Sequence, residues 1–262
     1  MDQKKPEISF IIVNYKSADY LKKCLASIWE KTGTLSFEVI VVNNDGIPLN
    51  STDFKYPIKL INSETNGGFG KGSNLGAESS SAEILCFINP DTELSTDNLD
   101  SIMDEFRLDG RVGAIGPDIV DEKGNTRGWT SGNEITLGRL IRHNLKLEPK
   151  PDFKSQNHKS EVDWVSGACL FIRQELFHKI GGFDEKFFAY YEDVDLCKRI
   201  KNEGYKILRL PEIKVLHWEG KSFTDQSHKK KLYYESQKEY FAKHHGKPKA
   251  EAVDFLRKMS HR

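Results

Sequence analysis

Apolar, β-branched runs alternate with helical stretches along the first 116 residues of this 262-residue chain, and this alternation constrains the fold most. The run at residues 37–42 has almost no polar alternation, which indicates that both of its faces are buried. Strands that alternate with helices predict an α/β fold with a Rossmann-like, mostly parallel sheet and helices on both faces. We predict strands at residues 7–13, 37–42, 58–61, 83–88 and 112–115, and helices at residues 18–31, 73–80 and 98–107.

The second half of the chain is less regular. The polar, weakly periodic segment 127–160 would form either a lid over a binding site or a long surface loop, and the sequence favours neither. We predict strands at residues 164–173, 206–210 and 213–216, with Pro211 between the last two, helices at residues 174–180 and 192–203, and a hairpin turn at residues 121–125.

Composition excludes several classes of protein. The formal net charge is zero, which argues against a nucleic-acid binder with a broad basic face. The apolar run 8–13 is too short for the core of a signal peptide, and no stretch approaches the length of a membrane span, so we expect a cytoplasmic protein. Widely spaced cysteines without a metal-binding pattern predict buried free thiols in a reducing compartment, namely Cys24, Cys86, Cys169 and Cys197.

The C-terminal segment 226–262 is basic. Residues 229–262 contain ten Lys or Arg against four Asp or Glu. Aromatic residues are interleaved with these charges, namely Tyr233, Tyr234, Tyr240, Phe241 and Phe255. We favour a solvated helical extension, and the alternative is peripheral contact with an anionic bilayer at the inner face of the cell membrane.

Polar side chains follow the first two predicted strands, where an open α/β sheet binds its ligands. Asn14 follows the first strand, and Asn43, Asn44 and Asp45 follow the second. An amide or carboxylate at this edge would read the N3–H and O4 of a pyrimidine. The alternative is that these residues only form turns, which Asn and Asp favour.

A glycine-rich segment, NGGFGKGSN at residues 66–74, precedes the predicted helix at 73–80. Glycines let the backbone approach a ligand closely and present N–H groups to phosphate, and a helix N-terminus favours anions. The spacing matches neither the dinucleotide fingerprint nor a P-loop. The alternative is a flexible surface loop.

Two acidic clusters lie at the ends of apolar runs. Asp91 follows the strand 83–88, and its carboxylate would hold Mg²⁺ or Mn²⁺ bridging two phosphates, with His217 completing the site. The alternatives are a turn at Asp91 and a surface histidine. Glu192 and Asp193 begin a helix, whose dipole is expected to keep Asp193 ionised and able to accept a proton. Asp195 would pair with Arg199 at i,i+4 and is interpreted as structural.

Taken in order along the chain, these motifs resemble family 2 glycosyltransferases of GT-A fold, most closely the branch that includes bacterial rhamnosyltransferases. The similarity covers residues 8–222, and Gly220 and Ser222 close the set after His217. The segments that carry it are SFIIVNY (9–15), VVNN (41–44), NGGFGKGSN (66–74), FINPDT (87–92), VSGA (165–168), GGFD (181–184) and EDVDLC (192–197).

The resemblance implies roles for individual residues. Asp193 would be the catalytic base with Glu192 beside it, and Asp91 and His217 would bind the divalent metal. Asn43 and Asn89 stand where many members carry Asp, which leaves a sparser metal site and an open nucleobase. The implied donor-binding residues are Asn14, Asn43, Asn44, Asp45, Asn66, Gly68, Phe69, Gly70, Lys71, Asn74 and Asn89. The implied acceptor-binding residues are Trp164, Gly167 and Tyr191, and Trp129, Tyr190 and Trp218 are further aromatic candidates.

The resemblance implies a single GT-A domain over residues 1–225, with a nucleotide-sugar-binding half at 1–116 and a smaller acceptor-side half at 117–225. The expected activity is inverting transfer of L-rhamnose from dTDP-rhamnose, or of a hexose or GlcNAc from UDP, to a cell-surface or lipid-linked glycan. The alternatives are a catalytically silent nucleotide-sugar-binding scaffold and a nucleotidyltransferase. The glycine-free loop at residues 14–17 disfavours the nucleotidyltransferase.

Overall fold

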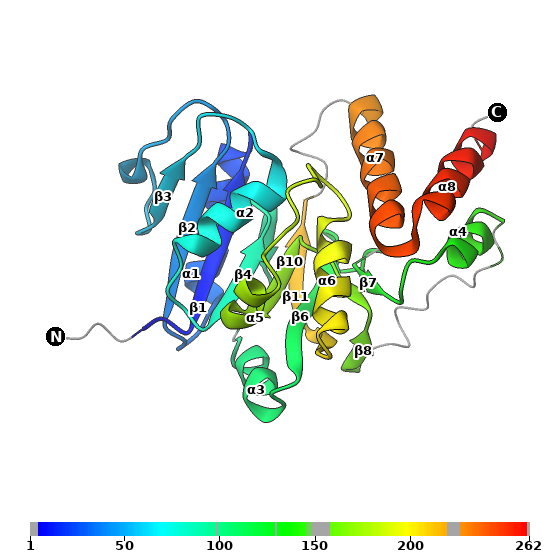
Figure 1. Ribbon diagram of the computed structural model, residues 1–262. Coiled ribbons are helices and arrows are strands. Elements are labelled where there is room, and N and C mark those ends of the chain that lie inside the picture. The colour runs from blue at the N-terminus through cyan, green and yellow to red at the C-terminus, as the bar shows by residue number, and fades with distance from the viewer. Residues whose placement is uncertain are drawn as a thin grey trace.

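A central β-sheet runs through the molecule in this computed structural model, which describes residues 5–97, 99–128, 130–145, 147, 158–218 and 226–260 (Figure 1). Among these residues the sheet has nine strands, in the order β3-β2-β1-β4-β10-β6-β11-β5, and β8 also pairs with β11. The strands are β1 (Ile8–Asn14), β2 (Phe37–Asn43), β3 (Lys59–Asn62), β4 (Ile84–Ile88), β5 (Thr92–Leu94), β6 (Val112–Val120), β8 (Ser160–Val162), β10 (Cys169–Arg173) and β11 (Lys206–His217).

The remaining elements surround this sheet. A small second sheet pairs β7 (Ser131–Gly132) with β9 (Trp164–Val165). The helices are α1 (Ala18–Lys31), α2 (Gly68–Glu78), α3 (Asp100–Leu108), α4 (Leu137–Asn144), α5 (Gln174–Lys179), α6 (Glu192–Asn202), α7 (Gln226–His245) and α8 (Lys247–Ser260), with a short 3₁₀ helix at Ser51–Asp53.

The sheet is mostly parallel, as the sequence predicted. Strands β3, β2, β1 and β4 are parallel neighbours, and β11 runs parallel to β6. The exceptions are β10, which is antiparallel to β4 and β6, and the short strands β5 and β8, which are antiparallel to β11. The polar residues that follow β1, β2 and β4 therefore meet at one edge of the sheet.

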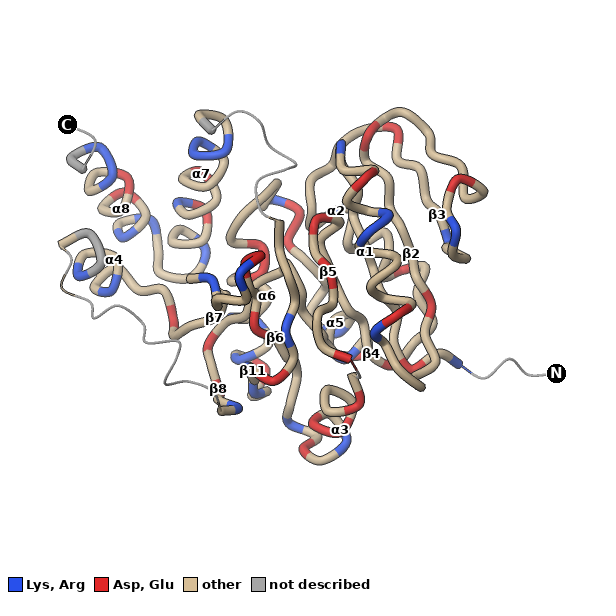
Figure 2. Tube along the Cα trace, turned by 180° about the vertical axis from the view of Figure 1, so that it is seen from behind, with Lys and Arg blue, Asp and Glu red and all other residues tan. Residues whose placement is uncertain are grey.

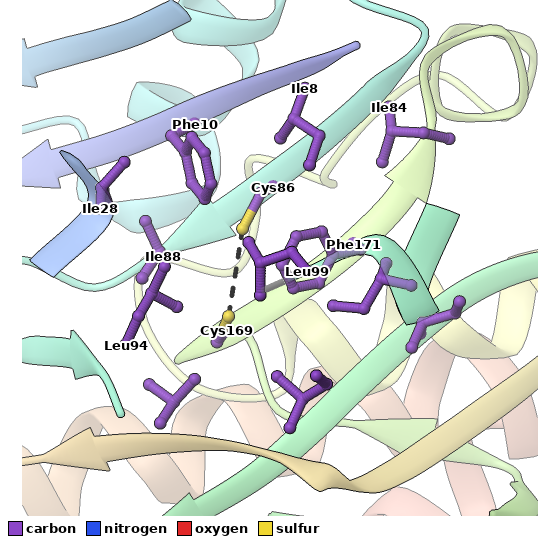
Figure 3. Packing of buried hydrophobic residues seen from close by; sticks show 14 of the residues in the cluster. Ile8, Phe10, Ile28, Ile84, Cys86, Ile88, Leu94, Leu99, Cys169 and Phe171 are labelled. Carbon is purple, nitrogen blue, oxygen red and sulfur yellow. Dashed lines mark hydrogen bonds between the residues drawn. The ribbon is translucent and has the colours of Figure 1, made fainter. Parts of the chain in front are cut away.

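Two hydrophobic cores cover the two faces of the sheet. On β1, Ile8, Phe10 and Ile12 pack with helices α1 and α3, whereas Ile11 faces the other core with α2, α5 and α6. Burial on both faces explains why these strands lack polar alternation. Figure 3 shows the first core, where the Sγ atoms of Cys86 and Cys169 lie 4.0 Å apart. All four cysteines are buried and free, which confirms that expectation.

Three predicted strands differ from the structure. The run 164–173 is split into β9 and β10 by Ser166, Gly167 and Ala168, whose backbone turns toward the end of the sheet. Conversely, β11 is a single strand that passes through Pro211. The pairing of β11 with β6 shifts register between Leu210 and Lys214, so the ladder needs no N–H donor at Pro211.

Three other predicted elements have different bounds or character. Helix α2 begins at Gly68 rather than at residue 73, so most of the glycine-rich segment is helical. Strand β6 extends to Val120 and continues into the predicted turn, where the Asp121 N–H donates to the Asn125 carbonyl at 2.9 Å. The segment 127–160 contains β7 and α4, and its first residues approach the end of the sheet.

The C-terminal segment is helical, as predicted, but it is not a solvated extension, because helices α7 and α8 pack against the core. Tyr240 and Phe241 on α7 are fully buried, and Ala250 and Val253 on α8 are 2% and 5% exposed. They join the second core together with α6. Basic residues lie along both helices (Figure 2). The division of the chain at residue 225 stays a prediction.

Within the described part of the chain, no helix combines the length and the apolar character needed to cross a membrane.

Candidate active site

A cleft of about 930 Å³ opens at the edge of the sheet where β1, β2, β4, β6 and β11 end. It collects residues from segments far apart in the sequence, which is the arrangement expected of a ligand site in an open α/β sheet. The predicted site residues that line it are Asn44, Asn66, Gly68, Phe69, Asn89, Asp91, Trp164, Gly167, Tyr191, Glu192, Asp193 and His217.

The predicted base, Asp193, lies in the first turn of α6 and remains partly exposed to the cleft. Its Oδ2 accepts a hydrogen bond from the Gly167 N–H at 2.8 Å, and its Oδ1 accepts one from the Val194 N–H at 2.8 Å. Burial raises the pKa of this carboxyl, and these N–H donors oppose burial. From the sequence we expected the helix dipole to keep Asp193 ionised. In the structure burial opposes that effect and raises the pKa.

Glu192 is the second carboxylate of this turn and is 8% exposed. Its Oε2 atom has no hydrogen-bond partner among the described residues. Burial, and then the neighbouring Asp193 charge, raise the pKa of Glu192 well above the usual range. Two adjacent carboxylates do not both ionise easily in a buried site, so this pair titrates together, with the pKa of each carboxyl raised by burial.

The backbone before α6 has an uncommon conformation. Tyr190 and Tyr191 have φ values of 68° and 65°, in the left-handed region that non-glycine residues rarely adopt. Helix α7 holds this turn, because Gln237 Nε2 donates to the Tyr191 hydroxyl at 2.8 Å and Ser236 Oγ donates to the Ala189 carbonyl at 2.7 Å. Local strain of this kind persists where surrounding contacts enforce it.

Asp91 and His217 face each other across the cleft end of β11. Asp91 Oδ1 lies 3.3 Å from His217 Nε2, and the Asp91 carbonyl accepts the Trp218 N–H at 2.9 Å. Adjacent ligands of an octahedral ion with bonds of about 2.1 Å lie about 3.0 Å apart, so this pair suits one divalent ion. No cluster of three or more His, Cys, Asp or Glu suited to a metal occurs among the described residues. Any further ligands would come from water or substrate oxygens.

Several predicted donor-binding residues face away from the cleft. Asn43 is 1% exposed, and its Nδ2 donates to the Ile47 carbonyl at 2.8 Å and to Asn62 Oδ1 at 2.9 Å. Asn14 Nδ2 donates to Asn43 Oδ1 at 2.9 Å and to Asp45 Oδ2 at 3.2 Å. These side chains join the strand ends to one another. Asn44 alone of this group lines the cleft, and its Nδ2 donates to the Gly68 carbonyl at 3.1 Å.

The glycine-rich segment packs mainly against protein. Gly68 has a φ of 86°, and a Cβ at this position would lie 2.4 Å from the Phe188 carbonyl oxygen. The Phe69 N–H donates to that same oxygen at 3.1 Å. Gly68 and Phe69 thus line the cleft while they anchor the segment before α6, and the Phe69 N–H is already engaged.

The rest of that segment lies outside the cleft. A Cβ on Gly70 would approach Phe183, and Lys71 is exposed. Asn74 Nδ2 donates to the Phe183 carbonyl at 2.9 Å, which ties α2 to the GGFD turn.

Some cleft residues were not singled out from the sequence. Arg127 lines the cleft and lies at the start of segment 127–160, whose role the sequence left open. Its Nη2 donates to the His217 carbonyl at 3.1 Å. Lys229 and Tyr233 come from α7, whose mixture of lysines and aromatics was the available signal. Trp218 does not line the cleft: its Nε1 donates to Glu93 Oε1 at 2.6 Å, and Lys23 lies 4.6 Å from its ring centroid. Trp129, Gly220 and Ser222 lie outside the described residues.

Known proteins resemble this chain over most of its length. The profile of Glycosyl transferase family 2 matches residues 9–181, and that of the N-terminal domain of galactosyltransferase matches residues 150–220. An N-acetylglucosaminyl-diphospho-decaprenol L-rhamnosyltransferase from Mycobacterium tuberculosis is 29% identical over 81% of this chain and 76% of its own. The rhamnosyltransferase WbbL of Escherichia coli is 23% identical over 80% of this chain and 83% of its own.

Solved structures share the fold. The mannosyltransferase PcManGT from Pyrobaculum calidifontis, in complex with GDP-Man and Mn²⁺, superposes with a TM-score of 0.61 at 14% identity over 96% of this chain and 74% of its own. GalNAc-T7 with UDP, GalNAc and Mn²⁺ has a TM-score of 0.60 at 16% identity, over 82% of this chain and 44% of that one. The family match spans most of the described cleft, and this chain belongs to glycosyl transferase family 2.

Proposed function

We propose that this glycosyltransferase moves L-rhamnose from dTDP-rhamnose to a hydroxyl of a lipid-linked glycan, with inversion at the anomeric carbon. The observation that carries the proposal is the common cleft, which holds a carboxylate suited to a base and a carboxylate–imidazole pair suited to a metal. The names of both rhamnosyltransferase relatives support the sugar, and the name of the Mycobacterium tuberculosis relative supports a lipid-linked acceptor.

In this proposal Asp193 takes the proton of the acceptor hydroxyl as that oxygen attacks the anomeric carbon. The bond from that carbon to the diphosphate oxygen breaks in the same step, and the nucleoside diphosphate leaves from the opposite face. Gly167 and Val194 orient the Asp193 carboxylate through their N–H groups. Asp91 and His217 would hold Mg²⁺ or Mn²⁺, which would offset charge on the leaving diphosphate.

Peripheral membrane contact is part of the same proposal. Lys230 and Lys238 are exposed on α7, and Arg and Lys also lie along α8 (Figure 2). Anionic lipids attract basic residues with about 1 kcal/mol each near the surface. Flotation with phosphatidylglycerol vesicles is expected at low salt and not with neutral vesicles, and equal flotation with both would refute this contact.

Nucleotide binding tests the function most directly. Thermal unfolding of the protein is followed with dTDP, UDP, GDP and ADP, each with and without Mn²⁺. Binding to the native state at about 100 times Kd adds about 2.7 kcal/mol of stability, so a Mn²⁺-dependent rise in Tm is expected with dTDP. A rise with UDP alone would transfer the proposal to a UDP-hexose or UDP-GlcNAc donor.

A matched pair of variants checks the metal ligands. Asp91→Asn is expected to lose the Mn²⁺-dependent part of the rise in Tm, whereas Asp97→Asn is expected to keep it. The Asp97 side chain is 79% exposed and, among the described residues, forms an ion pair only with Lys31. No stabilisation by any nucleotide, with or without Mn²⁺, would refute the proposed donor binding.

A further inference from the structure

We propose that Lys229, supplied by the C-terminal helix α7, binds a phosphate group carried by the acceptor substrate. This inference rests on the proposed function and specifies its acceptor, a glycan whose reacting sugar lies close to a phosphate or diphosphate. Lys229 lines the cleft although it lies 36 residues beyond Asp193 in the sequence.

The position of Lys229 is fixed by the packing of α7. Tyr233, one helical turn further along, also lines the cleft, and its hydroxyl lies 3.3 Å from the Tyr191 hydroxyl. Gln237 donates to that same Tyr191 hydroxyl at 2.8 Å, so three successive turns of α7 follow the segment that precedes the base. Further along, Lys243 Nζ lies 2.6 Å from Asp195 Oδ1 on α6. The helix therefore cannot swing away without breaking these contacts.

The charges in the cleft leave an anion-binding role for Lys229. No carboxylate within the described residues forms an ion pair with it, although Asp91, Glu192 and Asp193 line the same cleft. The donor diphosphate has its own cationic partners in the proposed mechanism, namely the metal on Asp91 and His217. No hydrogen bond joins α7 to Asp91 or His217 within the described part of the chain.

The acceptor must lie against Asp193, because that carboxylate takes its proton. Of the two α7 residues that line the cleft, Tyr233 contacts Tyr191, two residues before Asp193, and Lys229 lies one helical turn before Tyr233. A cation on the Tyr191 side of Asp193 faces the acceptor. The ammonium group of a lysine is a compact point charge that binds phosphate. The chemistry therefore selects acceptors with an anionic group near the reacting sugar over uncharged glycosides.

Two acceptors that differ only in charge test the inference. One is an N-acetylglucosaminyl diphosphate with a short prenyl chain, and the other is an uncharged alkyl glycoside of the same sugar with a chain of similar length. Lys229→Met is expected to raise KM for the diphosphate about tenfold to hundredfold, as expected for a lost charge-assisted contact, and to change the glycoside less than about twofold. Lys229→Arg is expected to recover part of the loss.

Lys231→Met is the matched control, because Lys231 is 70% exposed on the same helix and pairs with Glu235. It should behave as wild type on both acceptors. An equal loss on both acceptors in Lys229→Met, or no loss on the diphosphate, would overturn the inference. Competition by sugar-free phosphatidylglycerol vesicles at the concentrations of the acceptor, abolished in Lys229→Met, would instead assign the lysine to lipid headgroups.

A binding measurement makes the test independent of turnover. GlcNAc 1-phosphate is titrated calorimetrically into protein saturated with dTDP and Mn²⁺, and weaker binding to Lys229→Met than to Lys231→Met is expected. Absence of binding to wild type, or equal binding to both variants, counts against the inference. The proposed function is judged separately, by nucleotide-dependent stabilisation and by slow hydrolysis of dTDP-rhamnose without acceptor, both measured in wild type and in Lys231→Met.

Discussion

At the scale of single residues, the chemistry depends on how Asp193 is held. Its two oxygens accept N–H groups from Gly167 and Val194, so the carboxylate has one orientation toward the cleft. A Cβ on Gly167 would lie 3.4 Å from the Asp193 Cβ, so only a small residue leaves this approach undisturbed. Gly167 therefore positions the predicted base in addition to lining the cleft.

Replacing the base tests its role. Asp193→Asn keeps the shape of the side chain but removes its ability to take a proton, so kcat is expected to fall about 10²–10⁴-fold. Affinity for the nucleotide is expected to stay close to wild type, whereas the Tm is expected to fall slightly, because Asn offers one oxygen acceptor to two N–H donors. The exposed helix-end variant Glu203→Gln serves as control. Turnover within threefold of wild type in Asp193→Asn would remove Asp193 from the mechanism.

The pH dependence of the rate follows from the burial of the same carboxyl. Burial raises the pKa of Asp193, and a base is active only when deprotonated. The rate is therefore expected to fall as pH decreases through a pKa above the ordinary aspartate value of about 3.9. The measurement is kcat/KM against pH for wild type. An acidic limb at or below the ordinary value would contradict the assignment.

At the scale of elements, helices α6 and α7 are joined at Asp195. This carboxylate has a fully buried side chain and contacts Arg199, Lys243 and His244 at 2.8, 2.6 and 2.7 Å. Burial would raise its pKa, but the hydrogen bond with His244 and the charges of Arg199 and Lys243 outweigh burial and lower the pKa to about 2. The structural role expected from its i,i+4 pair with Arg199 is confirmed and extends to α7.

This junction makes stability depend on pH. Because the pKa of Asp195 is lower in the folded chain, its contribution is complete above the unfolded pKa of about 4 and is lost as pH falls toward 2. Asp195→Asn should therefore destabilise the protein more at pH 5 than at pH 3, by roughly 1 kcal/mol. Urea unfolding at both pH values measures the difference. The control is Asp104→Asn, because Asp104 forms an exposed ion pair with Arg107. Its effect on the free energy of unfolding should be the same at pH 5 and at pH 3.

At the scale of the whole molecule, the C-terminal helices complete one of the two cores. Phe241 is fully buried on α7, whereas Phe255 on α8 is 63% exposed. Both residues are phenylalanines in neighbouring helices, so a comparison of the two isolates the effect of burial. If α7 belongs to the core, only the first should matter for the stability of the fold.

Phe241→Ala is expected to lower the free energy of unfolding by about 3–5 kcal/mol, the usual effect of removing a buried aromatic ring. Phe255→Ala is expected to change it by no more than about 0.5 kcal/mol, as for other surface positions. Both values are read from urea unfolding of the full chain. Similar small effects in both variants would mean that α7 does not stabilise the core.

Local patterns in the sequence determined the class of fold and the two acidic positions. The spacing of apolar residues that marks a strand or a helix is set within a few neighbouring positions. The alternation of strands and helices was therefore sufficient to predict the doubly wound sheet. Asp91 follows a buried strand and Asp193 begins a helix, and both positions follow from the same local patterns. The motifs also predicted the family, which the comparison with known proteins confirmed.

Contacts between distant segments were decided only by the tertiary structure. Asn43 is turned inward by Asn62 on a neighbouring strand, and β11 passes through Pro211 because its partner strand shifts register there. Gly68 approaches Phe188, which lies more than 100 residues further along the chain. Lys229 approaches the cleft from the C-terminal helix α7. Such contacts depend on how the layers pack, and no local period in the chain records that packing.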